Sequence, residues 1–118
     1  MSDLADFDTY QELALRTASA ESLANSGAML NTAALGLAGE SGEIADHVKK
    51  VMFHGHPLDD ATRDKIAKEL GDLLWYCAMG ARGIGLGLSD IATMNVAKLK
   101  KRYPEGFSTD NSLNRPHG

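Results

Sequence analysis

Apolar residues recur every three or four positions along most of the chain, a period that predicts amphipathic helices and an all-α fold. Residues with turn or cap chemistry divide this pattern into four segments. The first predicted helix follows a Thr9-x-x-Glu12 capping box and covers residues 10–25. The second predicted helix starts between residues 29 and 32 and ends at residue 53. The third is capped by Asp59 or Asp60 and ends at residue 82. The fourth is capped by Ser89 and ends at residue 102.

The chain has 118 residues, which is enough for one domain. Residues 1–8 are acidic and aperiodic and are expected to form a flexible arm, residues 9–107 the domain, and the polar residues 108–118 a flexible tail. We expect a four-helix bundle built on a central helical hairpin. Because short helices that contain glycine bury little apolar surface, dimerisation would complete the bundle, with Trp75, Met79 and Leu88 in a shared interior.

Two carboxylate pairs with the same spacing occupy the predicted hairpin, Glu40 with Glu43 and Glu69 with Asp72. Residues three apart lie on one face of a helix, so each pair projects from one face. In an antiparallel hairpin the four acids would converge and repel one another unless cations neutralised them. The spacing therefore predicts a metal site, and the alternative is that these acids are ordinary solvated helix charges.

The ligand types indicate which metal is expected. A set of oxygen ligands suits hard divalent ions, so Mg²⁺ or Mn²⁺ is favoured over zinc. A di-iron site would need Glu-x-x-His on two helices, which neither pair provides, although His47 follows Glu43 by four residues on the same face. His54-x-His56 has no cysteine and no further histidine nearby, so it is a weak indication of zinc and is interpreted as a solvated loop.

Three glycines, Gly36, Gly39 and Gly42, lie inside the second predicted helix, where each costs up to about 1 kcal/mol relative to alanine. Their presence indicates close approach of another backbone, of a ligand, or of a tightly packed helix. Lys98, Lys101 and Arg102 end the fourth helix. They fit either the negative end of the helix dipole or contacts with phosphate.

Composition limits the functional classes. The formal net charge of −4 argues against general nucleic-acid binding. The one cysteine, Cys77, excludes an internal disulfide, fits a reducing compartment and lies in an apolar run that favours burial. No run of 18 apolar residues or hydrophobic signal core is present, so we expect a cytoplasmic protein that does not enter membranes.

Several motifs together resemble the all-α nucleoside triphosphate pyrophosphohydrolases of the MazG type, in particular the short single-domain members. These motifs are Tyr10-Gln11, the run from Leu35 to Glu43, Val48-Lys49-Lys50, the run from Glu69 to Tyr76, and Asn95-x-x-Lys98 through Phe107. The resemblance covers residues 9 to 108, and the four acidic positions show no departure from the family pattern.

The resemblance implies hydrolysis of an NTP or dNTP between the α- and β-phosphates, which yields the monophosphate and pyrophosphate with Mg²⁺, or Mn²⁺ as a substitute. It implies that the metal ligands and catalytic carboxylates are Glu40, Glu43, Glu69 and Asp72, one glutamate also acting as base. Lys50, Asn95, Lys98 and Arg102 become candidates for phosphate contacts, and Tyr76 or Trp75 for packing near the base or in the core. A homodimer or a dimer of dimers is implied as well.

Two other functions share this scaffold. The chain could be a non-catalytic nucleotide-binding or regulatory protein, although an acidic cluster without metal would be destabilising. It could also be a phosphoribosyl-ATP pyrophosphohydrolase, but the Trp75-Tyr76 and Tyr103-Pro104 contexts fit the MazG type better. Base and sugar preference depend on a few groups in a pocket, and the motifs for phosphate and metal are common to all these substrates.

Overall fold

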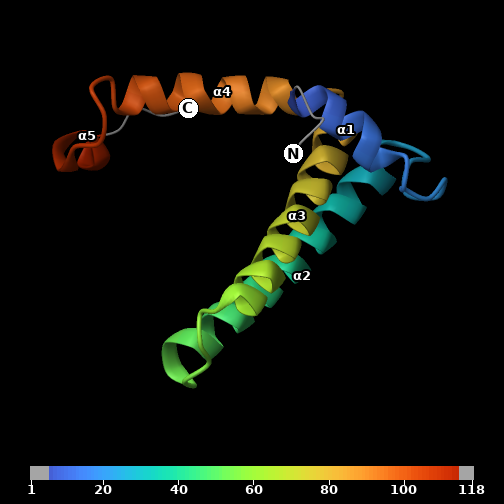
Figure 1. The fold of residues 1–118 in the computed structure, drawn as a ribbon. Helices are drawn as coiled ribbons and strands as arrows, with labels where there is room; N and C mark the ends of the chain where they lie inside the picture. The colour runs from blue at the N-terminus through green and yellow to red at the C-terminus, as the bar shows by residue number, and fades with distance from the viewer. Residues whose placement is uncertain (1–5, 115–118) are drawn as a thin grey trace.

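A computed structural model describes residues 6–114, and these residues form five α-helices and no strand (Figure 1). The all-α class predicted from the hydrophobic period is thus confirmed. The helices are α1 (Phe7–Leu15), α2 (Ser26–Phe53), α3 (Asp60–Gly83), α4 (Leu88–Arg102) and α5 (Thr109–Leu113).

A long antiparallel hairpin of α2 and α3 is the largest element of the molecule (Figure 1). With 28 residues, α2 is about 42 Å long at 1.5 Å per residue. The connection between the two helices includes Gly55, whose φ of 73° is accessible to glycine at little cost. Of the two predicted caps, Asp59 and Asp60, it is Asp59 that caps α3 by accepting a hydrogen bond from the Thr62 N–H at 2.9 Å.

The start of the first helix differs from the prediction. Asp6, and not Thr9, is the N-cap of α1, because its Oδ1 accepts a hydrogen bond from the Thr9 N–H at 2.7 Å. The helix therefore begins at Phe7, inside the stretch that was assigned to the arm, while residues 1–5 of that arm lie outside the described part of the chain.

The first helix also ends ten residues earlier than predicted, at Leu15, and turns follow up to residue 25. In these turns the Thr17 hydroxyl donates to the Ala14 carbonyl at 2.7 Å, and the Ser22 hydroxyl donates to the Ser19 carbonyl at 2.9 Å. Such local side-chain bonds compete with helical hydrogen bonds. The second helix instead starts early, at Ser26, because Asn25 caps it.

The last part of the chain departs from the prediction in two places. Gly87, and not Ser89, is the N-cap of α4, and the Asp90 carboxylate accepts from the Gly87 N–H at 2.9 Å. Ser89 bonds instead to Asp8 of α1. In the predicted tail, Thr109–Leu113 form α5, so this segment contains a helix that the sequence pattern did not indicate.

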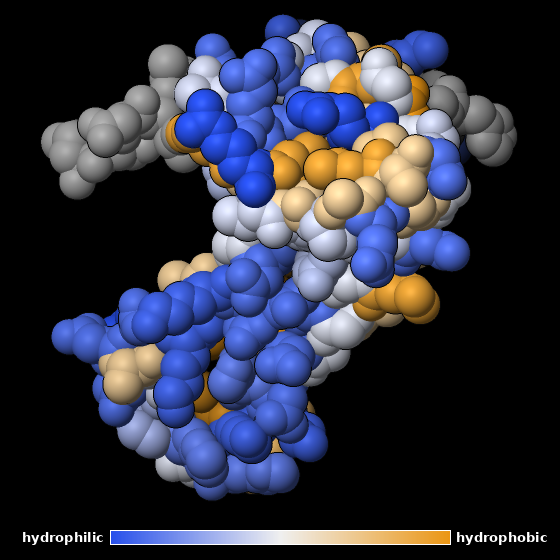
Figure 2. Space-filling view, turned by 90° about the vertical axis from the view of Figure 1, so that its right-hand side faces the viewer, coloured by the Kyte–Doolittle hydropathy of each residue, from blue (hydrophilic) through white to orange (hydrophobic). Residues whose placement is uncertain are grey.

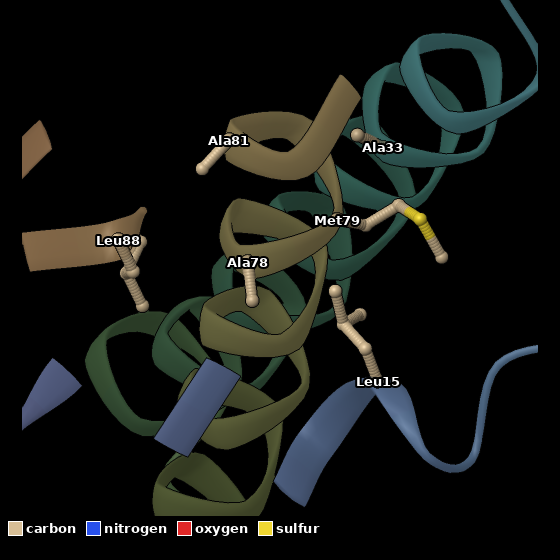
Figure 3. Packing of buried hydrophobic residues seen from close by; sticks show 6 residues of the cluster. All are labelled: Leu15, Ala33, Ala78, Met79, Ala81 and Leu88. Atoms are coloured by element: carbon tan, nitrogen blue, oxygen red, sulfur yellow. The ribbon is translucent and has the colours of Figure 1, made fainter. Parts of the chain in front are cut away.

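A small core lies where α1, α3 and α4 meet at the open end of the hairpin. Six buried apolar residues form it: Leu15, Ala33, Ala78, Met79, Ala81 and Leu88. Figure 3 shows Met79 pointing to the side of Leu15 and Ala81 to the side of Leu88. Met79 and Leu88 were expected in a dimer interior, but the single chain already buries both.

Gln11 is the one buried polar side chain of this region. Its Nε2 donates to the Ala78 and Leu86 carbonyls at 3.1 and 3.3 Å, and its Oε1 accepts from the Leu88 N–H at 3.1 Å. Buried polar groups need such partners. Gln11 therefore joins α1 to the end of α3 and the start of α4, and this connection fixes the corner of the molecule.

Beyond this corner, α4 makes its main contacts with α1 and α3 and then runs away from the hairpin (Figure 1). The four longer helices consequently do not close into a bundle within one chain. Figure 2 shows apolar surface near the corner, whereas the lower part of the hairpin is mostly hydrophilic. None of the helices in residues 6–114 has the length and apolar content needed to cross a membrane.

Candidate metal and nucleotide site

Three carboxylates meet in the middle of the hairpin. Glu40 comes from α2, and Glu69 and Asp72 come from adjacent positions on one face of α3. One oxygen from each side chain lies within 4.8 Å of the other two. The spacing of the sequence motif and the antiparallel pairing together produce this cluster.

Glu40 is the most constrained acid of the three. Its Oε2 is shielded from solvent and has no hydrogen-bond partner. The pKa of the Glu40 carboxyl is raised to about 7, first because its protonated form can hydrogen-bond to Glu69, then because of desolvation, and then because of the charges of Glu69, Asp72 and Glu43. Without a cation, the folded chain thus favours a proton on Glu40.

Within residues 6–114, no basic side chain forms an ion pair with this cluster. Among residues 6–114, the ion pairs of Lys and Arg involve other acids, namely Asp46, Asp60 and Asp64. A buried oxygen without a partner, beside two more carboxylates, is a donor set that suits a hard divalent cation. The cluster can therefore hold a metal ion.

Glu43 is separate from the other three acids. It is exposed and lines a shallow surface pocket with Gly39, Gly42, Asp46 and His47. Its charge still contributes to the raised pKa of Glu40. The predicted convergence of four carboxylates is thus a group of three, with Glu43 at its edge, because rotation about the α2 axis turns Glu43 outward.

A pocket of about 350 Å³ adjoins the cluster and is lined by Thr17, Glu40, Asp72, Trp75 and Tyr76. The Trp75 indole N–H donates to the Ala14 carbonyl and to the Thr17 hydroxyl, both at 2.9 Å. The sequence analysis did not identify Thr17 as a site residue, and no local signal marks it, because it reaches the pocket from the turn after α1.

The ring of Tyr76 is the reason that glycine is required at position 36 of α2. A Cβ atom at Gly36 would overlap the Tyr76 ring, so glycine lets α3 approach α2 at this point. The close approach expected at Gly36 is thereby confirmed. Open space surrounds Gly39 and Gly42, so helix packing does not require glycine there.

The predicted phosphate-binding residues lie away from the cluster in the single chain. Lys50 is near the closed end of the hairpin, and its Nζ pairs with Asp46 at 2.9 Å. Asn95 and Lys98 are exposed on α4, which runs away from the hairpin (Figure 1). Arg102, on the last turn of α4, has a shielded Nε with no hydrogen-bond partner.

Comparison with known proteins agrees with the all-α fold. The family model described as the MazG nucleotide pyrophosphohydrolase domain matches residues 29–107, which include α3, α4 and nearly all of α2. The chain is similar to the Gene 37 protein of Mycobacterium phage L5, with 36% identity over 87 residues that cover 73% of this chain and 76% of that protein. No solved structure matches the chain. The chain therefore belongs to the MazG nucleotide pyrophosphohydrolase family.

Proposed function

We propose that the protein hydrolyses a nucleoside triphosphate, NTP or dNTP, to the monophosphate and pyrophosphate in a reaction that requires Mg²⁺, for which Mn²⁺ can substitute. The observation that carries the proposal is the group of Glu40, Glu69 and Asp72 oxygens within 4.8 Å of one another in a chain of this family. In the reaction, water adds to the α-phosphorus, the bond from that phosphorus to the α,β-bridging oxygen breaks, and pyrophosphate leaves with the bridging oxygen.

The carboxylates fit the metal that this reaction needs. Glu40, Glu69 and Asp72 would hold the cation, and the unpartnered Glu40 Oε2 supports this assignment. When bound, the cation supplies positive charge for the triphosphate and makes water more acidic. Glu43 extends the acidic surface by one turn toward the closed end of the hairpin.

Glu43 and the adjoining pocket have distinct roles in the proposal. Because Glu43 is outside the group of three, its carboxylate oxygens are free to accept a proton from the attacking water. The pocket beside Glu40 and Asp72 would receive the nucleoside, with Tyr76 and Trp75 as aromatic walls. The β- and γ-phosphates and the nucleoside then lie on opposite sides of the α-phosphate.

A second copy of the chain would complete this site. The Cα radius of gyration is 17.1 Å, whereas a compact chain of this length has about 13–14 Å. The accessible surface is 8273 Å², compared with about 6200 Å² for a compact monomer of this mass. Apolar side chains of α4, including Met94, Val96 and Leu99, remain exposed. We therefore propose a homodimer, or a dimer of dimers, in which α4 brings Asn95, Lys98 and Arg102 to the phosphates at the partner's hairpin.

Product analysis tests the function. The protein is incubated with each common NTP and dNTP and with phosphoribosyl-ATP, once with Mg²⁺ and once with chelator. We expect monophosphate and pyrophosphate with Mg²⁺ only, and a loss of about 100-fold or more in Glu43→Gln if this carboxylate is the base. Glu12→Gln, at an exposed position on α1, is the matched control and should keep full activity.

The products also separate the proposal from its alternatives. Diphosphate and orthophosphate would show that another phosphoanhydride bond is cleaved. Binding without turnover of any nucleotide, in protein whose helical circular dichroism is intact, would favour a regulatory nucleotide-binding protein. Turnover that is equal with chelator would contradict the metal requirement.

A further inference from the structure

A second polar cavity lies nearer the closed end of the hairpin than the carboxylate cluster. Its volume is about 100 Å³, and it is lined by His47, Lys50, Val51, His56, Thr62 and Lys65. This volume equals about three water molecules in the liquid. It is too small for a nucleoside and comparable with a phosphoryl group.

The lining of this cavity consists mainly of hydrogen-bond donors from three segments. The two lysines provide ammonium groups, Thr62 provides a hydroxyl, and each imidazole donates a proton from at least one ring nitrogen. None of the carboxylates in the described part of the chain lines the cavity. A set of donors that converge on a small space fits an anion with several acceptor oxygens, and phosphate oxygens are such acceptors.

The backbone holds His56 at this position. Gly55 has a φ of 73°, which turns the chain back toward α2, and the His56 N–H then donates to the Lys50 carbonyl at 3.1 Å. His54 also donates its N–H to that carbonyl at 3.1 Å, but its side chain does not line the cavity. The loop is therefore shaped before any ligand binds, which lowers the cost of ordering it.

Two carboxylates lie near the lysines of the cavity. Asp46 accepts an ion pair from Lys50 at 2.9 Å and from Lys49 at 3.4 Å. The pKa of Asp59 is lowered mainly by its hydrogen bonds with Thr62, and the charge of Lys65 lowers it further. An anion in the cavity would share Lys50 with Asp46, whereas Lys65 makes no ion pair shorter than 4.0 Å with an acid of residues 6–114.

The cavity lies on the same two helices as the carboxylate cluster, farther toward the closed end of the hairpin. Lys65 precedes Glu69 by four residues, so it lies one turn toward the closed end on the same face of α3. His47 follows Glu40 by seven residues and lies two turns toward the closed end on α2. One turn is about 5–6 Å along the axis. The two terminal phosphates of a triphosphate can span the one turn from Glu69 to Lys65 when the α-phosphate lies at Glu69.

We propose that this cavity binds the terminal phosphoryl group of the substrate and, after cleavage, the pyrophosphate product, through Lys65, His56, His47 and Lys50. The proposal rests on the proposed function for the identity of the ligand, but the cavity and its donors are independent of it. It assigns the two histidines and Lys65, which the metal cluster and the nucleoside pocket do not use, to recognition of a polyphosphate.

Pyrophosphate is the probe for the test, measured by titration calorimetry with the full chain in the presence of Mg²⁺. The variants are Lys65→Gln and His56→Asn. The matched controls are Lys68→Gln, on the same helix and paired with Asp64 at 2.9 Å, and His54→Asn, in the same connection. Circular dichroism verifies that each variant keeps its helices.

We expect each cavity variant to weaken pyrophosphate binding about tenfold, the effect of losing one charge-assisted hydrogen bond. The controls should bind as the wild type does, and the affinity for nucleoside monophosphate should not change in any variant. Equal binding by the cavity variants and the wild type, or equal weakening by the controls, would overturn the proposal. So would binding of orthophosphate as tight as that of pyrophosphate, because the cavity would then select a free phosphate.

This test separates the cavity from the catalytic proposal. Pyrophosphate binding that depends on Lys65 and His56 supports the cavity even in a protein that hydrolyses no nucleotide. Hydrolysis with normal product inhibition by pyrophosphate in both variants would leave the catalytic proposal intact and overturn the cavity.

Discussion

At the scale of single residues, Glu40 links structure and chemistry most directly. Glu40 shares a face of α2 with Glu43, which follows it by three residues. Only packing against α3 shields the Glu40 Oε2 from water and brings it beside Glu69 and Asp72. A carboxylate in this position is unfavourable without a positive partner. The same arrangement that destabilises the metal-free hairpin prepares it to bind a cation.

The raised pKa of Glu40 predicts how the metal-free protein responds to pH. The folded-state pKa is about 7 and the ordinary value is 4.5, so the folded state binds the extra proton between these values and unfolding becomes easier as pH rises through this range. With chelator present, the melting temperature should be higher at about pH 5 than at about pH 8, and Glu40→Gln should reduce this difference.

Thermal melting followed by circular dichroism measures this difference. Glu12→Gln, in which another glutamate loses its charge, should retain the pH dependence of the wild type. Identical pH profiles for the wild type and Glu40→Gln would show that Glu40 does not take up the proton. Added Mg²⁺ should stabilise the wild type more than Glu40→Gln, because a ligand that binds only the folded state raises its stability.

At the scale of elements, the hairpin is held by close contact between α2 and α3. Gly36 faces the ring of Tyr76 without room for a methyl group, whereas Gly39 and Gly42 face open space three and six residues later. The helices are therefore tightly apposed near the corner, and space remains around the glycines that precede and follow the first carboxylate. That space is part of the surface shared by Gly39, Gly42 and Glu43.

Two alanine substitutions test this difference. Gly36→Ala should lower the free energy of unfolding by about 1–3 kcal/mol, because the Tyr76 ring must move. Gly39→Ala should raise it by up to about 1 kcal/mol, because alanine is the better helix former and meets no neighbour. Urea denaturation measures both, and destabilisation of equal size in the two variants would refute the close contact at Gly36.

At the scale of the whole molecule, the chain is more open than its length requires. α1, α3 and α4 meet at one corner around Gln11, and α4 then runs away from the hairpin (Figure 1). Met94, Val96 and Leu99 of α4 remain exposed, and among the described elements α4 has its main contacts with α1 and α3 at the corner. A surface of this kind favours association.

The proposed dimer can be tested by measuring the mass of the protein in solution. Sedimentation at micromolar concentration should give at least twice the mass of one chain. Val96→Glu places a charge on the exposed face of α4, where the single chain tolerates it because Val96 is 49% exposed. This variant should shift the protein toward monomer and reduce hydrolysis while its helical signal stays unchanged, and a monomeric wild type would contradict the dimer.

The sequence by itself determined the features that depend on local geometry. The 3.6-residue period defined four of the helices, and one of the two predicted aspartates, Asp59, caps α3. Two pairs of acids three residues apart had to lie on single helix faces. These relations are set within one or two turns, so no knowledge of distant contacts is needed. The motifs around the same acids also carried the resemblance to the MazG family, which the comparison then confirmed.

Other features were decided only by the tertiary structure. The rotation of α2 against α3 selected Glu40, Glu69 and Asp72 as the compact group and left Glu43 at its edge. The placement of Thr17 beside Trp75, the burial of Gln11 and the direction of α4 depend on contacts between distant residues, such as Trp75 with Thr17, 58 positions apart, and Gln11 with Ala78, 67 positions apart. A period along the chain cannot encode them, because helix rotation and crossing are fixed by packing between elements.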